Sequence, residues 1–162
     1  MSSLLFLVLL SLTAYAQPVH EICQNCHNDK LEDLKAHKHF SKNLSCDACH
    51  GESSQHSNSN GAVAPDRVSA AHDIPKLCGG CHSKQGGEYL ESKHAKVVLA
   101  KGKARAAQCA TCHGHHRQRT AAHTLLQCKR CHASLPASHP QPAGGDKCWT
   151  CHSPHTLLVA KK

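Results

Sequence analysis

The chain has few aromatic residues, with two Phe, two Tyr and one Trp among 162 residues. Aromatic side chains supply much of the buried area in ordinary globular interiors, so a conventional hydrophobic core is not expected. The only methionine is Met1, which leaves the rest of the chain without a thioether ligand for a metal. No apolar run approaches the ~20 residues needed to cross a bilayer, which argues against a membrane-spanning protein.

The N-terminal segment has the pattern of an export signal. Residues 4–12 are almost all apolar, and Ala14 and Ala16 put small side chains at both positions that a signal peptidase reads. No Lys or Arg precedes the apolar run, so only the amino terminus supplies positive charge there. We expect a signal peptide over residues 1–16, a mature chain over 17–162, and a periplasmic or extracellular location.

Cysteine and histidine are abundant instead, with 12 Cys and 17 His. The pattern Cys-x-x-Cys-His occurs six times and uses every cysteine in the chain. Its cysteines are Cys23, Cys26, Cys46, Cys49, Cys78, Cys81, Cys109, Cys112, Cys128, Cys131, Cys148 and Cys151. The histidines that complete the motifs are His27, His50, His82, His113, His132 and His152.

Each part of this spacing has a chemical reason. Two thiols three positions apart on a short helical turn reach the two vinyl groups of one porphyrin, and the adjoining imidazole lies under its iron. A zinc site, a redox dithiol or a disulfide framework explains a CxxC pair but does not need the following histidine. The sequence therefore predicts six covalently attached haem c groups, each with one histidine ligand.

A second axial ligand must come from histidine, because no methionine follows Met1 and every cysteine is used as a thioether. Eleven histidines lie outside the motifs: His20, His37, His39, His56, His72, His94, His115, His116, His123, His139 and His155. Six are needed, so this surplus predicts bis-histidine ligation at all or most haems.

The stretches between the motifs show no sustained helical or alternating periodicity. We expect a mainly irregular fold with short α-helices on the motifs, few or no strands, and haems packed closely in place of a core. One longer helix is predicted over residues 88–101 and loops over 53–65 and 136–145. Approximate tandem haem-pair repeats cover about 34–86 and 88–133, followed by a closing unit over 134–155.

These motifs carry a family resemblance over residues 34–155. Residues 128–155 resemble the doubled CXXCH motif of multihaem cytochromes, and residues 89–114 resemble the repeat of periplasmic multihaem cytochromes of respiratory and metal-reducing microbes. In that family the histidine before a motif, and the second histidine of CHGxH and CHxPH, ligate the iron of a different haem. The resemblance implies the distal ligands His39, His56, His94, His116, His139 and His155. His37 competes with His39, His115 with His116, and His72 with His56.

The expected function is electron transfer through the six haems in respiratory or extracellular electron transport, with redox partner proteins as donor and acceptor. The net charge of +8 does not indicate a nucleic-acid partner, because two propionates on each of six haems add about twelve negative charges. One alternative is a nitrite, hydroxylamine or tetrathionate reductase, which needs an iron with an open face, although no CxxCK variant occurs. Another is a protomer of an extracellular cytochrome filament, a homo-oligomer in which a ligand would cross between subunits.

Overall fold

A computed structural model of the chain describes residues 20–100, 107–140 and 147–160. The expected signal peptide at 1–16 lies outside these residues. The elements, in chain order, are α1 (His20–Lys35), η1 (Phe40–Lys42), α2 (Asp47–His50), α3 (Ser54–Asn58), α4 (Ile74–Gly79), α5 (Ser83–Leu90), α6 (Lys93–Leu99), α7 (Cys109–His113), α8 (Ala121–Cys131) and η2 (Cys148–Thr150). No strand forms in the described residues, where the only ladder pairing is an isolated bridge between His152 and Val159. The expectation of short helices in a mainly irregular chain is therefore confirmed.

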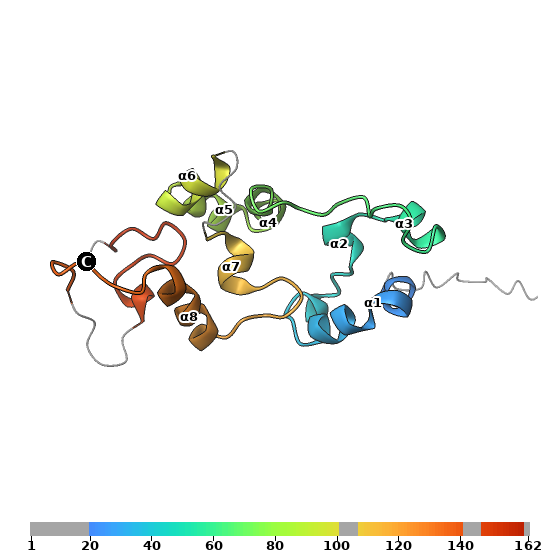
Figure 1. Cartoon of the computed structure of the whole chain (residues 1–162), viewed down its shortest axis with the longest axis horizontal. Coiled ribbons are helices and arrows are strands. Elements are labelled where there is room, and N and C mark those ends of the chain that lie inside the picture. The colour runs from blue at the N-terminus through green and yellow to red at the C-terminus, as the bar shows by residue number, and fades with distance from the viewer. Residues whose placement is uncertain (1–19, 101–106, 141–146, 161–162) are drawn as a thin grey trace, which may run out of the picture.

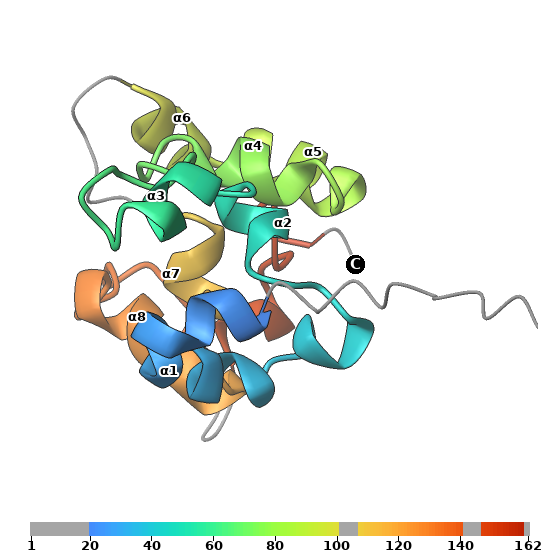
Figure 2. The same cartoon turned by 90° about the vertical axis from the view of Figure 1, so that its right-hand side faces the viewer.

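The molecule is elongated, and the chain turns back after α6 so that α7 lies in the middle and the loop after it approaches α1 (Figure 1). Helices α1, α2 and α3 occupy one end, α4, α5 and α7 the middle, and α8 with the C-terminal segment the other end. The view along this axis shows the helices arranged as a ring of short pieces rather than as packed layers (Figure 2). Within the described residues, no helix combines the length and the hydropathy of a bilayer span.

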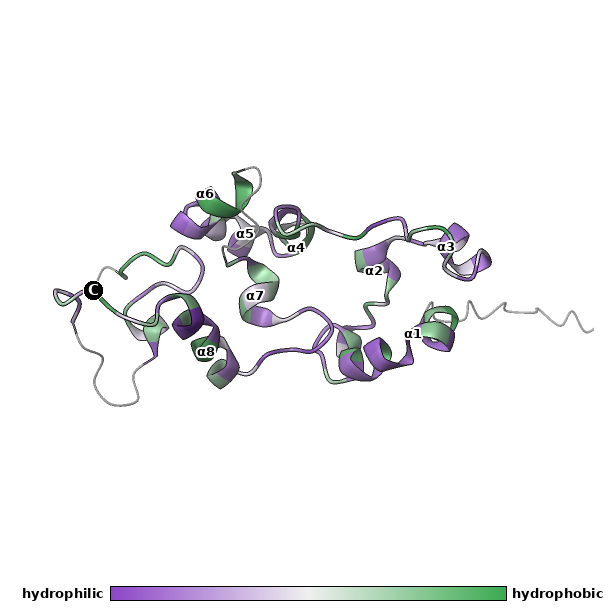
Figure 3. Cartoon of the chain, in the orientation of Figure 1, coloured by the Kyte–Doolittle hydropathy of each residue, from purple (hydrophilic) through white to green (hydrophobic). Residues whose placement is uncertain are grey.

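The protein part of the core is very small. Among the described residues, the buried hydrophobic side chains are Leu31, Tyr89, Ala95 and Val98. Large apolar side chains such as Val68 and Val159 are exposed, and the hydrophobic residues are divided among short separate segments along the chain (Figure 3). The polypeptide by itself buries too little apolar surface for a chain of this length.

The single helix expected over residues 88–101 is wrong, because two helices occupy this segment. Helix α5 ends at Leu90 and α6 begins at Lys93, and residues from 101 lie outside the described part. Ser92 is fully buried between the two helices, and its side-chain oxygen accepts a hydrogen bond from the Ala95 backbone N–H at 3.0 Å. This N-cap starts a new helix where hydrophobic spacing alone suggests a continuous one. The loop expected over 53–65 likewise contains the short helix α3.

Candidate haem sites

Each CxxCH motif forms one helical turn. Two motifs lie inside helices α1 and α7. In the other four, the backbone N–H of the motif histidine donates to the carbonyl of the first cysteine at 2.9 Å, as seen for His50, His82, His132 and His152. This geometry puts both thiols and the imidazole within one turn, as attachment to one porphyrin requires. No disulfide bond joins any of the twelve cysteines, all of which lie among the described residues.

The motifs fall into two alternating local forms. In the first, third and fifth motifs a helix leads into the motif and the histidine leaves it with φ near −110° and ψ near +50°, as at His27, His82 and His132. The second and fourth motifs start their own short helices and end on Gly51 and Gly114, whose φ values are +76° and +79°. The sixth motif starts the short helix η2 but is followed by Ser153 instead of glycine, so the alternation covers the first five motifs.

Every motif histidine faces one histidine from outside the motifs. The ring centroids are 6.0 Å apart for His27 and His56, 5.9 Å for His50 and His116, 6.0 Å for His82 and His39, 6.2 Å for His113 and His155, 6.0 Å for His132 and His94, and 6.1 Å for His152 and His139. The six partners are the six histidines that the family resemblance implies, and each is used once.

This spacing differs from that of ordinary ring contacts in the same molecule. His37 and His39 are 4.5 Å apart, His115 and His116 are 5.0 Å apart, and His20 lies 5.2 Å from Phe40. The six paired sites instead fall between 5.9 and 6.2 Å. Two ligating nitrogens at about 2 Å on opposite sides of one iron put imidazole centroids about 6.3 Å apart. The paired rings thus leave room for one metal ion between them.

Hydrogen bonds at Nδ1 orient several of these rings. His50, His56, His139 and His152 place Nδ1 at 2.7–3.2 Å from the backbone carbonyl oxygens of Arg67, Val63, Pro140 and Leu157, in that order. Because a carbonyl oxygen can only accept, Nδ1 must carry the proton and donate it. This tautomer leaves the Nε2 lone pair free to bind a metal, which is the usual role of such partners around ligating histidines.

Two further ligand rings differ, because one has a carboxylate partner at Nδ1 and the other has no partner there. His155 Nδ1 lies 3.1 Å from a carboxylate oxygen of Glu88, which holds the C-terminal segment against α5. Nδ1 of His94 is buried and has no hydrogen-bond partner among the described residues. An unsatisfied buried polar atom costs about 1–3 kcal/mol, and no polypeptide acceptor fixes the tautomer of His94 among the described residues.

In three of the six pairs, the surroundings of one ring favour neutral imidazole. Burial is the main cause that lowers the pKa of His94, His113 and His116, and repulsion from neighbouring histidines lowers it further. Neutral imidazole is the form that binds a metal, since the protonated ring has no free lone pair. The pairs therefore suit metal ligation better than ion pairing.

The remaining histidines lie elsewhere. His20 Nδ1 is 3.5 Å from the Cys46 sulfur, and His72 Nε2 is 3.5 Å from a carboxylate oxygen of Asp73. The buried His37 accepts a hydrogen bond at Nδ1 from the backbone N–H of His39. His123 bonds the hydroxyl that caps α8. His115 touches the ring of His116 and lines a cavity beside α7.

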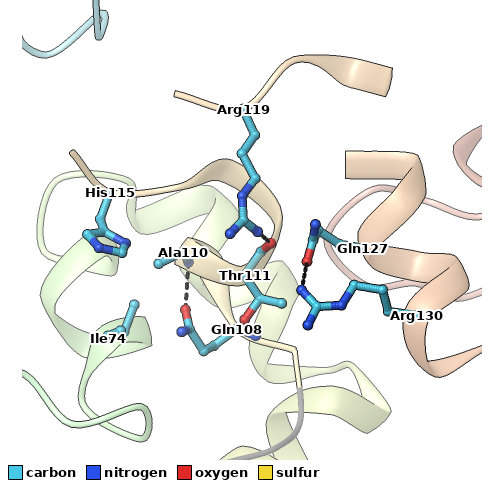
Figure 4. A pocket seen from close by; sticks show the side chains of 8 residues that line it. All are labelled: Ile74, Gln108, Ala110, Thr111, His115, Arg119, Gln127 and Arg130. Carbon is cyan, nitrogen blue, oxygen red and sulfur yellow. Dashed lines mark hydrogen bonds between the residues drawn. The ribbon is translucent and has the colours of Figure 1, made fainter. Parts of the chain in front are cut away.

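That cavity, of about 280 Å³, shows how an arginine braces a motif (Figure 4). The Arg119 guanidinium donates to the carbonyl of Thr111 inside the fourth motif, and its backbone N–H donates to the His113 carbonyl at 2.9 Å. Arg67 does the same for the second motif, donating to the carbonyls of Cys49 and His50. Sequence reasoning missed both arginines, because they follow their motifs at different spacings.

The glycine after the fourth motif allows this bracing loop to close. A Cβ added at Gly114 would lie 2.0 Å from the Arg117 carbonyl oxygen. We therefore expect Gly114→Ala to destabilise the protein by about 3 kcal/mol or more, because the backbone must move and φ is positive. Gly87→Ala is the matched control: nothing lies within 4 Å of its Cβ, and the change should stabilise α5 by about 0.5–1 kcal/mol. Chemical unfolding of the two variants checks this, and equal midpoints would contradict it.

Comparisons with protein-family models, curated proteins and solved structures find no match for this chain. Within the described residues, no group of three or more His, Cys, Asp or Glu side chains is placed to hold a metal ion together. The arrangement consists of opposed pairs of imidazoles, each beside two cysteines.

Proposed function

We propose that this protein is an electron carrier holding six covalent c-type haems, each ligated by two histidines. The observation that carries the proposal is the set of six opposed imidazole pairs at 5.9–6.2 Å, one for each CxxCH motif. Bound haem supplies a one-electron couple. No alternative use of six CxxCH turns requires a second imidazole at this spacing.

The chain's own residues have distinct tasks in this scheme. The two cysteines of each motif anchor the porphyrin, and the motif histidine holds one face of the iron. The distal histidine closes the other face, and the Nδ1 partners at rings such as His56 and His139 fix the tautomer and the ring orientation. Basic side chains such as Arg130, beside the α7 cavity, suit the haem propionates (Figure 4).

The paired rings favour a carrier over a reductase. A nitrite, hydroxylamine or tetrathionate reductase needs at least one iron with an open or weakly held position for its substrate. Here each of the six motif imidazoles has a second imidazole opposite it, so the chain provides two ligands at every site. All six distal partners come from this chain, so a filament is not needed to complete any site.

We further propose that the protein works in the periplasm or outside the cell, where respiratory or extracellular electron transport takes place. Its partners would be a donor and an acceptor protein. Covalent attachment suits such a compartment, because thioether bonds keep the haem on the protein whatever the surrounding redox chemistry.

Redox titration of the haem-loaded protein tests the proposal. Bis-histidine ligation and interaction between neighbouring haems should give a broad titration at potentials below zero millivolts, and the reduced protein should bind little carbon monoxide. A single sharp one-electron step at high potential would contradict the proposal. Ready uptake of carbon monoxide would instead support the reductase.

A further inference from the structure

Contacts between motifs follow the order of the motifs in the chain. At the first junction, the Cys46 thiol interacts with the Cys23 thiol of α1, and His20 of the same helix lies 3.5 Å from the Cys46 sulfur. An ion pair at 2.6 Å joins Asp33 of α1 to Arg117, next to the distal histidine of the second motif. The first and second motifs are therefore neighbours.

The next two junctions continue the series. The segment that leads into the second motif reaches the third, because the ring of His39, seven residues before Cys46, lies 6.0 Å from the ring of His82. Helix α4, which carries the third motif, packs on α7, which carries the fourth, and the thiols of Cys78 and Cys109 interact directly. The second, third and fourth motifs thus lie in sequence.

The last two junctions join the fourth motif to the fifth and the fifth to the sixth. Helix α8 packs on α7, and the Thr124 hydroxyl of α8 donates to the Cys112 carbonyl of the fourth motif at 2.9 Å. The segment that leaves the fifth motif reaches the sixth, because the ring of His139, seven residues after His132, lies 6.1 Å from the ring of His152. The fifth motif therefore lies between its two neighbours in the chain, in agreement with the layout along the long axis (Figure 1).

The distal histidines follow a rule in the interior of the molecule and depart from it at both ends. His39 lies before the second motif and pairs with His82 of the third motif. In the same way, His94 lies before the fourth motif and pairs with His132 of the fifth. The rings of His116 and His155 follow the fourth and sixth motifs and each pair with a motif two places back.

Under the same rule His56 would require a motif before residue 23, and His139 one after residue 152. They pair instead with His27 of the first motif and His152 of the sixth. Each interior site thus takes its second histidine from beside another motif under one rule. The two outermost sites depart from this rule and use His56 and His139.

From these contacts we infer that the six sites form one unbranched path in chain order, with the His27–His56 and His139–His152 sites as its two ends. The inference rests on the proposed function. Electrons enter at one outer site and leave at the other, about the full length of the molecule away (Figure 1). A donor and an acceptor can then dock at opposite ends without competing for one surface.

A crystal or cryo-electron microscopy structure of the haem-loaded protein tests the order directly. The nearest iron to each site should belong to the preceding or the following motif, with the first and sixth irons farthest apart. Six irons in a branched or reordered arrangement would overturn the path and leave the proposed function standing. A protein with fewer than six irons would contradict the proposed function itself.

Photoreduction from either end tests the same order in solution. A ruthenium sensitiser is attached at Asn58→Cys, in α3 beside His56, or at the exposed Leu158→Cys, beside the sixth motif. His56→Met or His139→Met marks one outer haem by its altered spectrum. The haem marked by His56→Met should be reduced first when the sensitiser is at residue 58 and last when it is at residue 158. The haem marked by His139→Met should show the opposite order. The same order from both sensitisers would overturn the path.

Discussion

Produced without attached haem, the chain should show no cooperative unfolding transition. The described residues bury only four apolar side chains, while leucines and valines such as Leu126 and Val68 remain exposed. Most helices are shorter than the ~12–15 residues at which an isolated helix becomes even marginally stable in water. In the proposed haem protein, the porphyrins would supply most of the buried apolar surface that opposes chain entropy.

Expression with and without haem-attachment machinery gives the matched pair of samples. The haem-loaded protein should melt cooperatively and show fixed aromatic signals in near-ultraviolet circular dichroism, whereas the haem-free chain should lose both. The haem-free chain should also keep little far-ultraviolet helix signal. A cooperative melt of the haem-free chain would show that the polypeptide folds through its own contacts.

Replacement of one distal histidine should open one haem and leave five closed. The ring centroids of His27 and His56 are 6.0 Å apart. In His56→Ala, the haem attached beside His27 would lose this second imidazole. The reduced variant should bind about one equivalent of carbon monoxide per protein and show one high-spin signal. His72→Ala is the control, because His72 is exposed and lies against Asp73 rather than against a motif histidine.

Optical titration with carbon monoxide measures this difference. Equal uptake by the two variants would contradict the assignment of His56. Uptake by His72→Ala alone would transfer the ligand role to His72, the competing histidine in the sequence.

The motif chemistry is predictable from the sequence because all the residues that carry it are adjacent. Cys46, Cys49 and His50 occupy one helical turn, so spacing alone defines their geometry. The partner of His50 is different, because His116 lies beyond two intervening motifs. Only the path of the chain in space decides which ring reaches it, and the sequence offered a family resemblance there rather than a physical derivation.

The competing histidines illustrate what the structure adds. His37 is buried and uses Nδ1 to accept from the His39 backbone, which leaves the neighbouring ring opposite His82. His115 lines the cavity beside α7 (Figure 4). The ring of His116 faces His50 instead. Adjacent or nearly adjacent histidines point in different directions, so composition and spacing could not separate them.

The fold was predictable only in outline. Short motifs without periodic stretches between them predicted short helices and few strands, as observed. The break between α5 and α6 was not predicted, because it depends on the buried cap at Ser92. The loops braced by Arg67 and Arg119 also depend on backbone contacts made over different sequence separations, 17 residues from His50 to Arg67 and six from His113 to Arg119, so no fixed spacing marks them.

Intact mass spectrometry of the mature protein is the most direct test of the central claim that six haems are attached. Every cysteine belongs to a CxxCH motif, so six complete attachment sites are available. Protein from a host with working haem-attachment machinery should exceed the mass of its processed polypeptide by six haem masses, on the order of 3.7 kDa. A mass equal to that of the bare polypeptide, or an increment of fewer than six haems, would contradict the account.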